Sequence, residues 1–110
     1  MLHIRTLCLG AAASAMLATG AFANPFDAPS TLPLQAPMFD KIKDTDYQPA
    51  LEKGMKEQIA EMDAIANNKA APTFENTIVA MEKSGRLLDR ASEAFFAVVQ
   101  ANTNATLDKV

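Results

Sequence analysis

Apolar residues recur at helical spacing in the first of two long segments. The apolar positions of this segment are Leu51, Met55, Ile59, Met62 and Ala66. Their steps of three and four residues place them on one face of an α-helix. Asp44, Thr45 and Asp46 precede this face and suit an N-cap and a first helical turn. The pattern therefore predicts an amphipathic helix over 44–67 that packs through this face.

The second segment predicts a longer helix, over 73–101. Thr73 suits the N-cap, and Glu75 suits the first turn because a carboxylate there interacts favourably with the helix dipole. The expected seam consists of Phe74, Ile78, Met81, Leu88, Phe95 and Val99, with Gly85 and Ser92 at the two remaining positions. At ~1.5 Å per residue, such a helix is about 40 Å long. Together with the short loop before it, the two segments predict a long antiparallel helical hairpin and an all-α fold.

A third helix is expected to begin near the last residue. Asn102, Thr103 and Asn104 interrupt the second helical pattern and supply a new N-cap, so that residues 105–110 read as the start of another helix. We therefore expect the sequence to continue in a longer protein.

The segment before the first helix is rich in proline. Pro25, Pro29, Pro33 and Pro37 are spaced four residues apart, and this density of proline disfavours a helix and favours extended backbone. Large apolar side chains such as Phe26 are interleaved with the prolines, which is unusual in a disordered linker. We interpret residues 24–43 as an extended strap that lies over a larger body. A disordered linker is the alternative.

Residues 1–23 have the features of a secretory signal peptide. The basic residue Arg5 precedes an uncharged run, and Ala21, Phe22 and Ala23 form an A-x-A cleavage site before Asn24. The small residues of the run favour a cleaved signal over a membrane anchor. The sequence therefore predicts an exported, periplasmic protein that begins at Asn24 and does not remain in the membrane.

Charge and composition exclude several kinds of site in residues 24–110. Only one of the 10 basic residues, Arg5, precedes position 24, which leaves nine basic against 13 acidic side chains. This balance argues against nucleic-acid binding. Because His3 and Cys8 are the only His and Cys in the chain, the segment after the leader can form no disulfide, Cys- or His-ligated zinc site, or Ser-His or Cys-His pair. We predict no catalytic, cofactor-binding or metal-binding residue in it.

The charged clusters have structural interpretations. The groups Glu57, Glu61, Asp63 and Asp40, Asp44, Asp46 lack the spacing around a glycine that a calcium loop needs, and are interpreted as a solvated helix face and a helix cap. Arg86 and Arg90 could hold an anion, but Asp89 and Glu93 among them favour a salt-bridged surface.

The order of several short motifs resembles a known family. The motifs are Asn24-Pro25, the run 37–43, the run 47–51, the run 65–67, Pro72-Thr73-Phe74-Glu75-Asn76-Thr77, Phe95-Phe96 and the run 101–104. In this order they resemble the amino-terminal region of the thimet oligopeptidase family of zinc metallopeptidases. Within that family they are most similar to the bacterial peptidyl-dipeptidases, also called dipeptidyl carboxypeptidases.

The resemblance implies a large helical peptidase that acts on short peptides. In this family an H-E-x-x-H helix and a downstream glutamate hold the zinc, and the glutamate of the motif acts as the general base. None of these residues is present in this chain. The resemblance therefore implies that residues 44–110 are an amino-terminal, non-catalytic helical segment, which is inactive alone and has the rest of the peptidase chain as its partner. The alternatives are a free-standing secreted helical hairpin that acts as an interaction module, and a small structural periplasmic protein.

Overall fold

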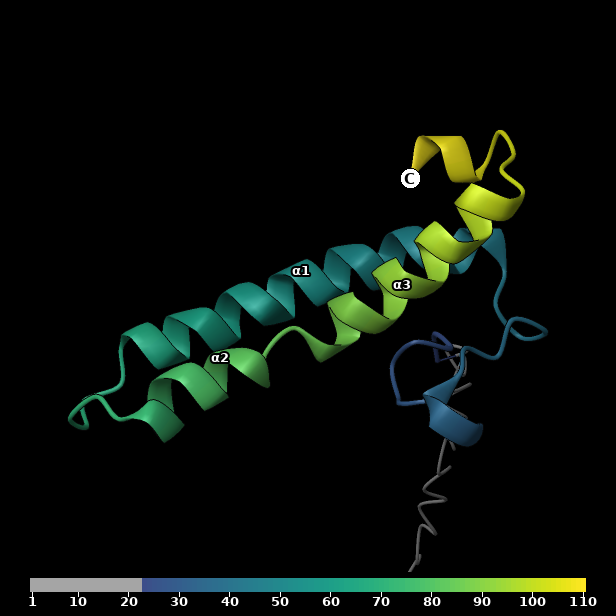
Figure 1. Ribbon diagram of the computed structural model, residues 1–110. Coiled ribbons are helices and arrows are strands. Elements are labelled where there is room, and N and C mark those ends of the chain that lie inside the picture. Colours follow the sequence, from purple (N-terminus) through teal and green to yellow (C-terminus); the bar gives the residue numbers. More distant parts are fainter. Residues whose placement is uncertain (1–22) are drawn as a thin grey trace, which may run out of the picture.

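Two antiparallel helices dominate the computed structural model, which describes residues 23–110 (Figure 1). Helix α1 spans Asp44–Ala66 and helix α3 spans Arg86–Ala101, and the two lie side by side along the length of α3. The described residues contain helices and turns but no strands. The predicted all-α fold is thus confirmed. The predicted signal peptide, apart from Ala23, lies outside the described residues.

Helix α1 agrees with the prediction to within one residue at its C-terminal end. Lys43 is the N-cap in extended conformation, and its backbone N–H donates to the Asp46 carboxylate at 2.8 Å. This contact satisfies a backbone donor at the start of the helix, where no intrahelical acceptor is available. At the other end, the Asn67 side chain donates to the Asp63 carbonyl at 2.8 Å. The expected cap chemistry of Asp46 is therefore confirmed.

The face through which α1 packs agrees only in part with the one that the apolar pattern predicts, since Leu51 contacts the core but the later positions do not. The buried residues of α1 are Tyr47, Ala50 and Gly54, whereas Met55, Ile59 and Met62 of the predicted face are exposed. In α3 the buried residues are Leu87, Ala91 and Ala94, although Leu88, Phe95 and Val99 were expected at the seam and are only partly buried. The predicted seam is therefore only partly correct. Leu51, Phe95 and Val99 pack against the core, but the buried core also contains Ala50, Ala91 and Ala94, which a search for large apolar residues overlooks.

Gly54 explains why small residues occupy the seam. A Cβ atom on Gly54 would lie 2.8 Å from both the backbone nitrogen and the Cα atom of Leu88. Only a residue without a side chain permits this approach, and the helix tolerates the propensity cost of about 1 kcal/mol that glycine carries relative to alanine. The close contact at Gly54 brings the backbones of α1 and α3 together.

The predicted single helix over 73–101 is interrupted. A π-helical turn spans Phe74–Val79, α2 spans Ala80–Glu82, and the chain breaks before α3 begins at Arg86. Gly85 lies in the left-handed region with φ 73° and is the N-cap of α3. Left-handed glycine commonly ends helices. The prediction of one continuous helix was therefore wrong, because Gly85 was assigned to the seam instead of to a helix end. The predicted N-cap at Thr73 is confirmed by the hydrogen bond that its hydroxyl accepts from the Asn76 N–H at 3.0 Å.

The C-terminal residues form a short 3-10 turn, Leu107–Lys109, instead of an α-helix that begins at Ala105. The Asn104 side chain starts this turn by accepting hydrogen bonds from the backbone N–H groups of Thr106 and Leu107. Leu107 is buried and belongs to the same core as the residues between α1 and α3. The turn therefore closes one end of the hairpin.

The proline-rich segment lies against this same end of the hairpin, but its backbone is not extended throughout. A 3-10 turn spans Pro33–Gln35, with Leu34 and Gln35 at positive φ, and further turns occur at 25–26 and 39–41. Phe26 is the anchor of the segment. Its side chain is 4% exposed, and its ring lies 5.5 Å from the Tyr47 ring, centroid to centroid. Phe26 thus packs the segment against the hairpin, and turns replace part of the expected extended conformation.

Candidate functional site

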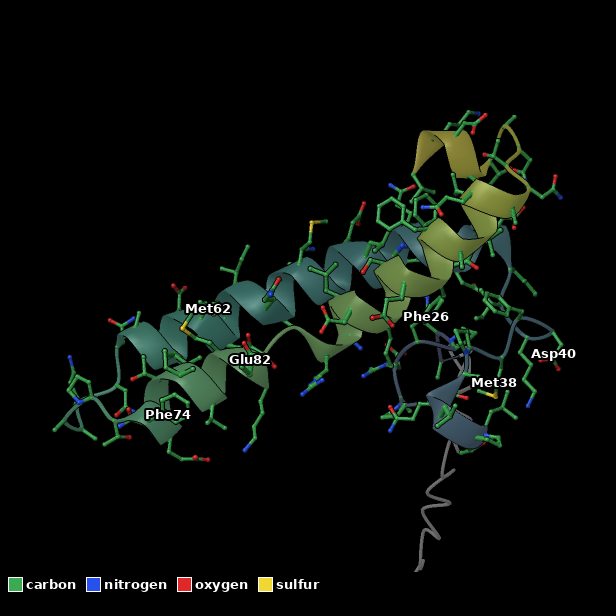
Figure 2. All side chains as sticks on the ribbon, in the orientation of Figure 1. Phe26, Met38, Asp40, Met62, Phe74 and Glu82 are labelled. Carbon is green, nitrogen blue, oxygen red and sulfur yellow. The ribbon has the colours of Figure 1, made fainter. Side chains whose placement is uncertain are left out.

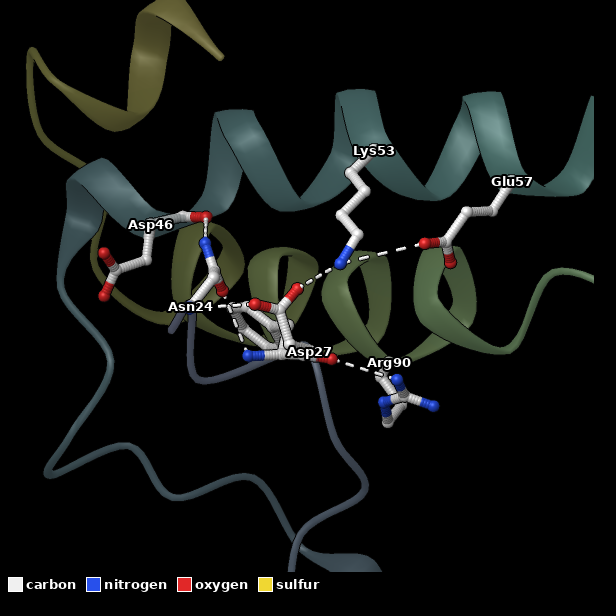
Figure 3. A network of polar contacts seen from close by, with 7 residues as sticks. Asn24, Asp27, Asp46, Lys53, Glu57 and Arg90 are labelled. Carbon is white, nitrogen blue, oxygen red and sulfur yellow. Dashed lines mark hydrogen bonds and ion pairs between the residues drawn. The ribbon is translucent and has the colours of Figure 1, made fainter. Parts of the chain in front are cut away.

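A polar cluster joins the start of the strap to both helices, and we call it the clasp (Figure 3). Its members are Asn24, Phe26, Asp27, Asp46, Lys53, Glu57 and Arg90. Lys53 Nζ lies 2.6 Å from Asp27 Oδ1 and 3.7 Å from Glu57 Oε1. The Asn24 side chain donates to the Asp46 carbonyl at 2.9 Å. The clasp therefore connects residues that are more than 20 positions apart in the sequence.

The Asp27 carboxylate is the centre of the clasp. Its Oδ1 accepts from Lys53, and its Oδ2 accepts from the Asn24 backbone N–H at 3.0 Å. The hydrogen bond from Lys53 lowers the pKa of the Asp27 carboxyl, and the same hydrogen bond raises the pKa of Lys53. Both groups are therefore held in their charged forms. Burial also raises the pKa of the nearby Tyr47, with smaller contributions from the charges of Asp44 and Asp46.

Arg90 holds the strap from the side of α3. Its Nη2 donates to the Phe26 carbonyl at 2.9 Å, whereas its Nε is buried and lacks a hydrogen-bond partner among the described residues. A cavity of about 150 Å³ lies between the strap and α3, and Arg90 and Glu93 are its charged lining residues. The salt-bridged surface expected for Arg86, Asp89, Arg90 and Glu93 does not form in residues 23–110, where the ion pairs are Lys53 with Asp27, Lys53 with Glu57, and Lys83 with Glu75.

Four of the six carboxylates weighed as metal ligands, Asp44, Asp46, Glu57 and Glu61, have structural contacts. Glu61, expected on a solvated face, accepts the backbone N–H of Gly85 at 2.7 Å and so caps the start of α3. Asp44 accepts from the Asn104 side chain at 2.8 Å. Within residues 23–110 no group of three or more His, Cys, Asp or Glu side chains could hold a metal ion. None of the helices described in this range is long and apolar enough to cross a membrane.

The outer half of the hairpin exposes a set of large apolar side chains, which we call the tip group. Its members are Met55, Ile59, Met62, Phe74, Ile78 and Met81. Ile59 is 63% exposed and Phe74 is 72% exposed. Met62 and Phe74 come from opposite arms of the hairpin at this end (Figure 2). Surface apolar residues are ordinary when scattered, but a concentration of this kind is typical of an interaction surface.

The clasp was not predicted from the sequence. Asn24 was noted as the residue after a cleavage site and as part of the Asn24-Pro25 motif. Asp27 and Lys53 lie 26 positions apart, so that no local spacing connects them. One signal was available, because Lys53 and Glu57 are one helical turn apart, a spacing at which opposite charges can pair. The structure adds Asp27 to this pair, since the strap folds back onto α1.

The fold and its surfaces define a helical hairpin with a strap fastened at one end and apolar side chains exposed at the other. No family model matches the sequence. The chain is 47% identical over 87 residues to a dipeptidyl carboxypeptidase of Salmonella typhimurium, and 48% identical over 87 residues to a dipeptidyl carboxypeptidase of Escherichia coli. The matched region is 79% of this chain but only 13% of each relative. The chain therefore spans a small part of the length of the curated relatives it matches.

Proposed function

We propose that this chain is the amino-terminal, non-catalytic helical part of an exported zinc metallopeptidase of the thimet oligopeptidase family. In this proposal the whole protein acts on short peptides as a peptidyl-dipeptidase. The observation that carries the proposal is the identity of 47% and 48% to two dipeptidyl carboxypeptidases, in a region that makes up 13% of their length. A similarity of this extent supports a shared fold and a shared role for the matched region.

The zinc of the proposed peptidase is not held by the residues described here. Residues 24–110 contain no His or Cys, and the side chains of Asp46, Glu61 and Asp27 are engaged as caps or in an ion pair. Catalytic zinc sites in proteins use His, Cys and carboxylate ligands and keep one position open for water. The zinc ligands, and with them the general base of the motif, are therefore assigned to the part of the protein outside this segment.

The tip group supports a role as a wall that packs against the remainder of the peptidase. Met62 and Phe74 lie at the end of the hairpin away from the strap, and the other members follow on α1 and on residues 74–81. Burial of this apolar surface stabilises an interface by about 25 cal/mol per Å². The relatives have most of their length outside the matched region, which is the proposed source of the covering surface.

Export is the second part of the proposal. The leader pattern and the Ala21-Phe22-Ala23 site support secretion with cleavage before Asn24. Amino-terminal sequencing of the protein recovered from a periplasmic extract tests this directly. A mature protein that begins at Asn24 is expected, and a product that retains Met1 contradicts export by this route.

The peptidase activity is tested on the complete product of the gene. We expect it to release carboxyl-terminal dipeptides from short peptides with blocked amino termini, to lose this activity with a chelator, and to regain it with zinc. Residues 24–110 expressed alone should be inactive under every one of these conditions. Chelator-sensitive hydrolysis by this segment alone would overturn the assignment of the catalytic groups to the rest of the protein.

Two variants test whether the tip group packs against the rest of the peptidase. Phe74→Asp and Ile59→Glu introduce charge at exposed positions while they preserve helix formation. Both variants should lower the yield of soluble, active peptidase, whereas Leu34→Glu, at a position that is 102% exposed on the strap, should leave it unchanged. A reading frame that stops at Val110, with a stable monomer that binds a separate protein through the tip group, would favour the free-standing hairpin instead.

A further inference from the structure

The first residue after the predicted cleavage site is already bound in the clasp. The backbone nitrogen of Asn24 donates to Asp27 Oδ2 at 3.0 Å, and the other oxygen of this carboxylate accepts from Lys53 on α1 at 2.6 Å. Ala23, the residue that precedes the cleavage site, is exposed. The bond that signal peptidase would cut is thus next to an atom with a defined acidic partner (Figure 3).

Cleavage changes the chemistry of this nitrogen without requiring it to move. While Ala23 is attached, the nitrogen is a neutral amide with one proton to donate. Hydrolysis of the bond between Ala23 and Asn24 converts it to a primary amine, which takes up a proton at neutral pH and becomes an α-ammonium group. The Asp27 carboxylate is charged before and after cleavage, so the hydrogen bond is charge-assisted in both forms, and cleavage adds the attraction between two opposite charges. The contact with Asp27 therefore becomes an ion pair.

We propose that the Asp27 carboxylate is a binding site for the α-ammonium group that signal-peptide removal creates at Asn24. The new ion pair then holds the strap on the hairpin more tightly in the processed protein. This inference rests on the cleavage before Asn24 that forms part of the proposed function, and it does not depend on the peptidase activity.

The remaining contacts of Asn24 connect the amino terminus to the core. Its side-chain oxygen accepts from the Phe26 N–H at 3.0 Å, and its side-chain nitrogen donates to the Asp46 carbonyl on α1. Phe26 packs on Tyr47 and is held by Arg90 through its carbonyl. An amino terminus fixed by Asp27 therefore keeps Phe26 in its buried position.

The charged groups around the site come from all three packed elements. Asp27 belongs to the strap, Asp46, Lys53 and Glu57 belong to α1, and Arg90 belongs to α3. Lys41 and Lys43 line the hollow next to Ala23 and Asn24. Lys53 occupies only one of the two Asp27 oxygens. The second oxygen is therefore available to the amino terminus, and each cation has its own acceptor.

The test measures how fast the α-amine reacts with an amine-specific acylating reagent in the complete exported protein. Only the uncharged amine reacts, so an ion pair with Asp27 slows labelling. The amino-terminal peptide is followed by mass spectrometry at neutral pH. Asp27→Asn keeps a hydrogen-bond acceptor but removes the charge, and should speed labelling by roughly three- to tenfold. Asp40→Asn is the matched control, because Asp40 is an exposed carboxylate on the same strap, and should leave the rate unchanged.

A second variant separates direct binding from an indirect effect of the ion pair with Lys53. Lys53→Met removes the partner of Asp27 on α1 but leaves the carboxylate in place for the amino terminus. Labelling of Lys53→Met should therefore stay slow. If this variant labels as fast as Asp27→Asn, the carboxylate acts only by holding Lys53, and the proposal is overturned.

Insertion of one alanine between Ala23 and Asn24 provides an independent test. After cleavage the inserted residue carries the amine, and Asn24 keeps only its neutral N–H. Hydrogen exchange of the peptide that contains Phe26 should become faster in this variant and in Asp27→Asn. The protein with both changes should exchange no faster than Asp27→Asn alone. Additive effects, an unchanged labelling rate in Asp27→Asn, or a mature protein that starts elsewhere would each overturn the proposal. Peptidase activity without these effects would leave the proposed function intact.

Discussion

Gly54 on α1 lies directly against the backbone of Leu88 on α3, and a Cβ atom at Gly54 would be only 2.8 Å from the Leu88 Cα atom. Small residues are buried on both helices as well, with Ala50 on α1 and Ala91 and Ala94 on α3. The hairpin is thus held by close backbone approach, while several of its largest side chains remain exposed.

Gly54→Ala should destabilise the hairpin although alanine is the better helix former. The added methyl group meets backbone atoms that cannot rotate away, and overpacking of this kind costs about 1–3 kcal/mol. The free energy of opening of α1 and α3, measured by hydrogen exchange, reports the change. Ala60→Gly, at an exposed position of α1, measures the effect of helix propensity alone. Propensity by itself would make Ala60→Gly destabilising and Gly54→Ala stabilising. A stabilised Gly54→Ala protein would rule out the close contact.

Gly85→Ala should destabilise the junction between α2 and α3. Its φ of 73° costs a residue with a side chain about 1–2 kcal/mol, and the new Cβ would also lie 2.7 Å from the Gln58 side chain. The Gln58 side chain can move, whereas the backbone angle cannot change without loss of the N-cap. Gln58→Ala should therefore relieve only part of the effect, as measured by hydrogen exchange at the start of α3. Complete rescue by Gln58→Ala would show that backbone strain is unimportant here.

Phe26→Ala should release the strap from the hairpin. The Phe26 ring is almost fully buried against Tyr47, and truncation of a buried phenylalanine typically costs about 3–5 kcal/mol. Limited proteolysis within residues 24–43 should become much faster in this variant. Leu34→Ala changes a fully exposed residue of the same strap and should have no effect. Equal cleavage rates in the two variants would mean that Phe26 does not anchor the strap.

The attachment of the strap should depend on pH at two limits. The pKa of Asp27 is lowered from 3.8, so its contribution is complete above that value and is lost as the pH falls through the lower folded value. The pKa of Lys53 is raised from 10.5, so its contribution is complete below that value and is lost as the pH rises through the higher folded value. Strap protection, followed by hydrogen exchange corrected for intrinsic rates, should therefore weaken beyond both limits. In Lys53→Met, strap protection should depend much less on pH at the acid end. An unchanged pH profile in this variant would contradict the role of the Asp27–Lys53 pair.

Residues 24–110 expressed alone should be helical but poorly packed. The exposed tip group leaves the outer half of the hairpin without a second packing surface, and exposed apolar area of this kind favours association or a fluctuating state. Far-ultraviolet circular dichroism should show helix, thermal melting should be broad, and binding of a dye specific for apolar surface should be high. A sharp, cooperative melt of a monomer would contradict this expectation and favour the free-standing hairpin.

The sequence by itself determined the helices that have strong local signals. The cap chemistry before α1 and the spacing of its residues located that helix to within one residue, and Thr73 was correctly assigned as an N-cap. These features depend on groups only a few residues apart, so a linear pattern contains the information. The proline spacing likewise excluded a long helix from the strap, although it did not predict the turns at 33–35 and 39–41.

Only the tertiary structure decided which faces meet and which distant charges pair. The apolar pattern favoured Met55, Ile59 and Met62, because periodicity identifies an apolar face but not the surface that will cover it. The hairpin instead buries Gly54 and the alanines, since small residues permit the backbones to approach. A glycine such as Gly85 can occur in a helix seam or at a helix end, and the sequence does not distinguish the two. Its positive φ is seen only in the folded chain. The pairing of Asp27 with Lys53 depends on the path of the strap. The two residues are 26 positions apart in the sequence, and their charged atoms lie 2.6 Å apart in the structure.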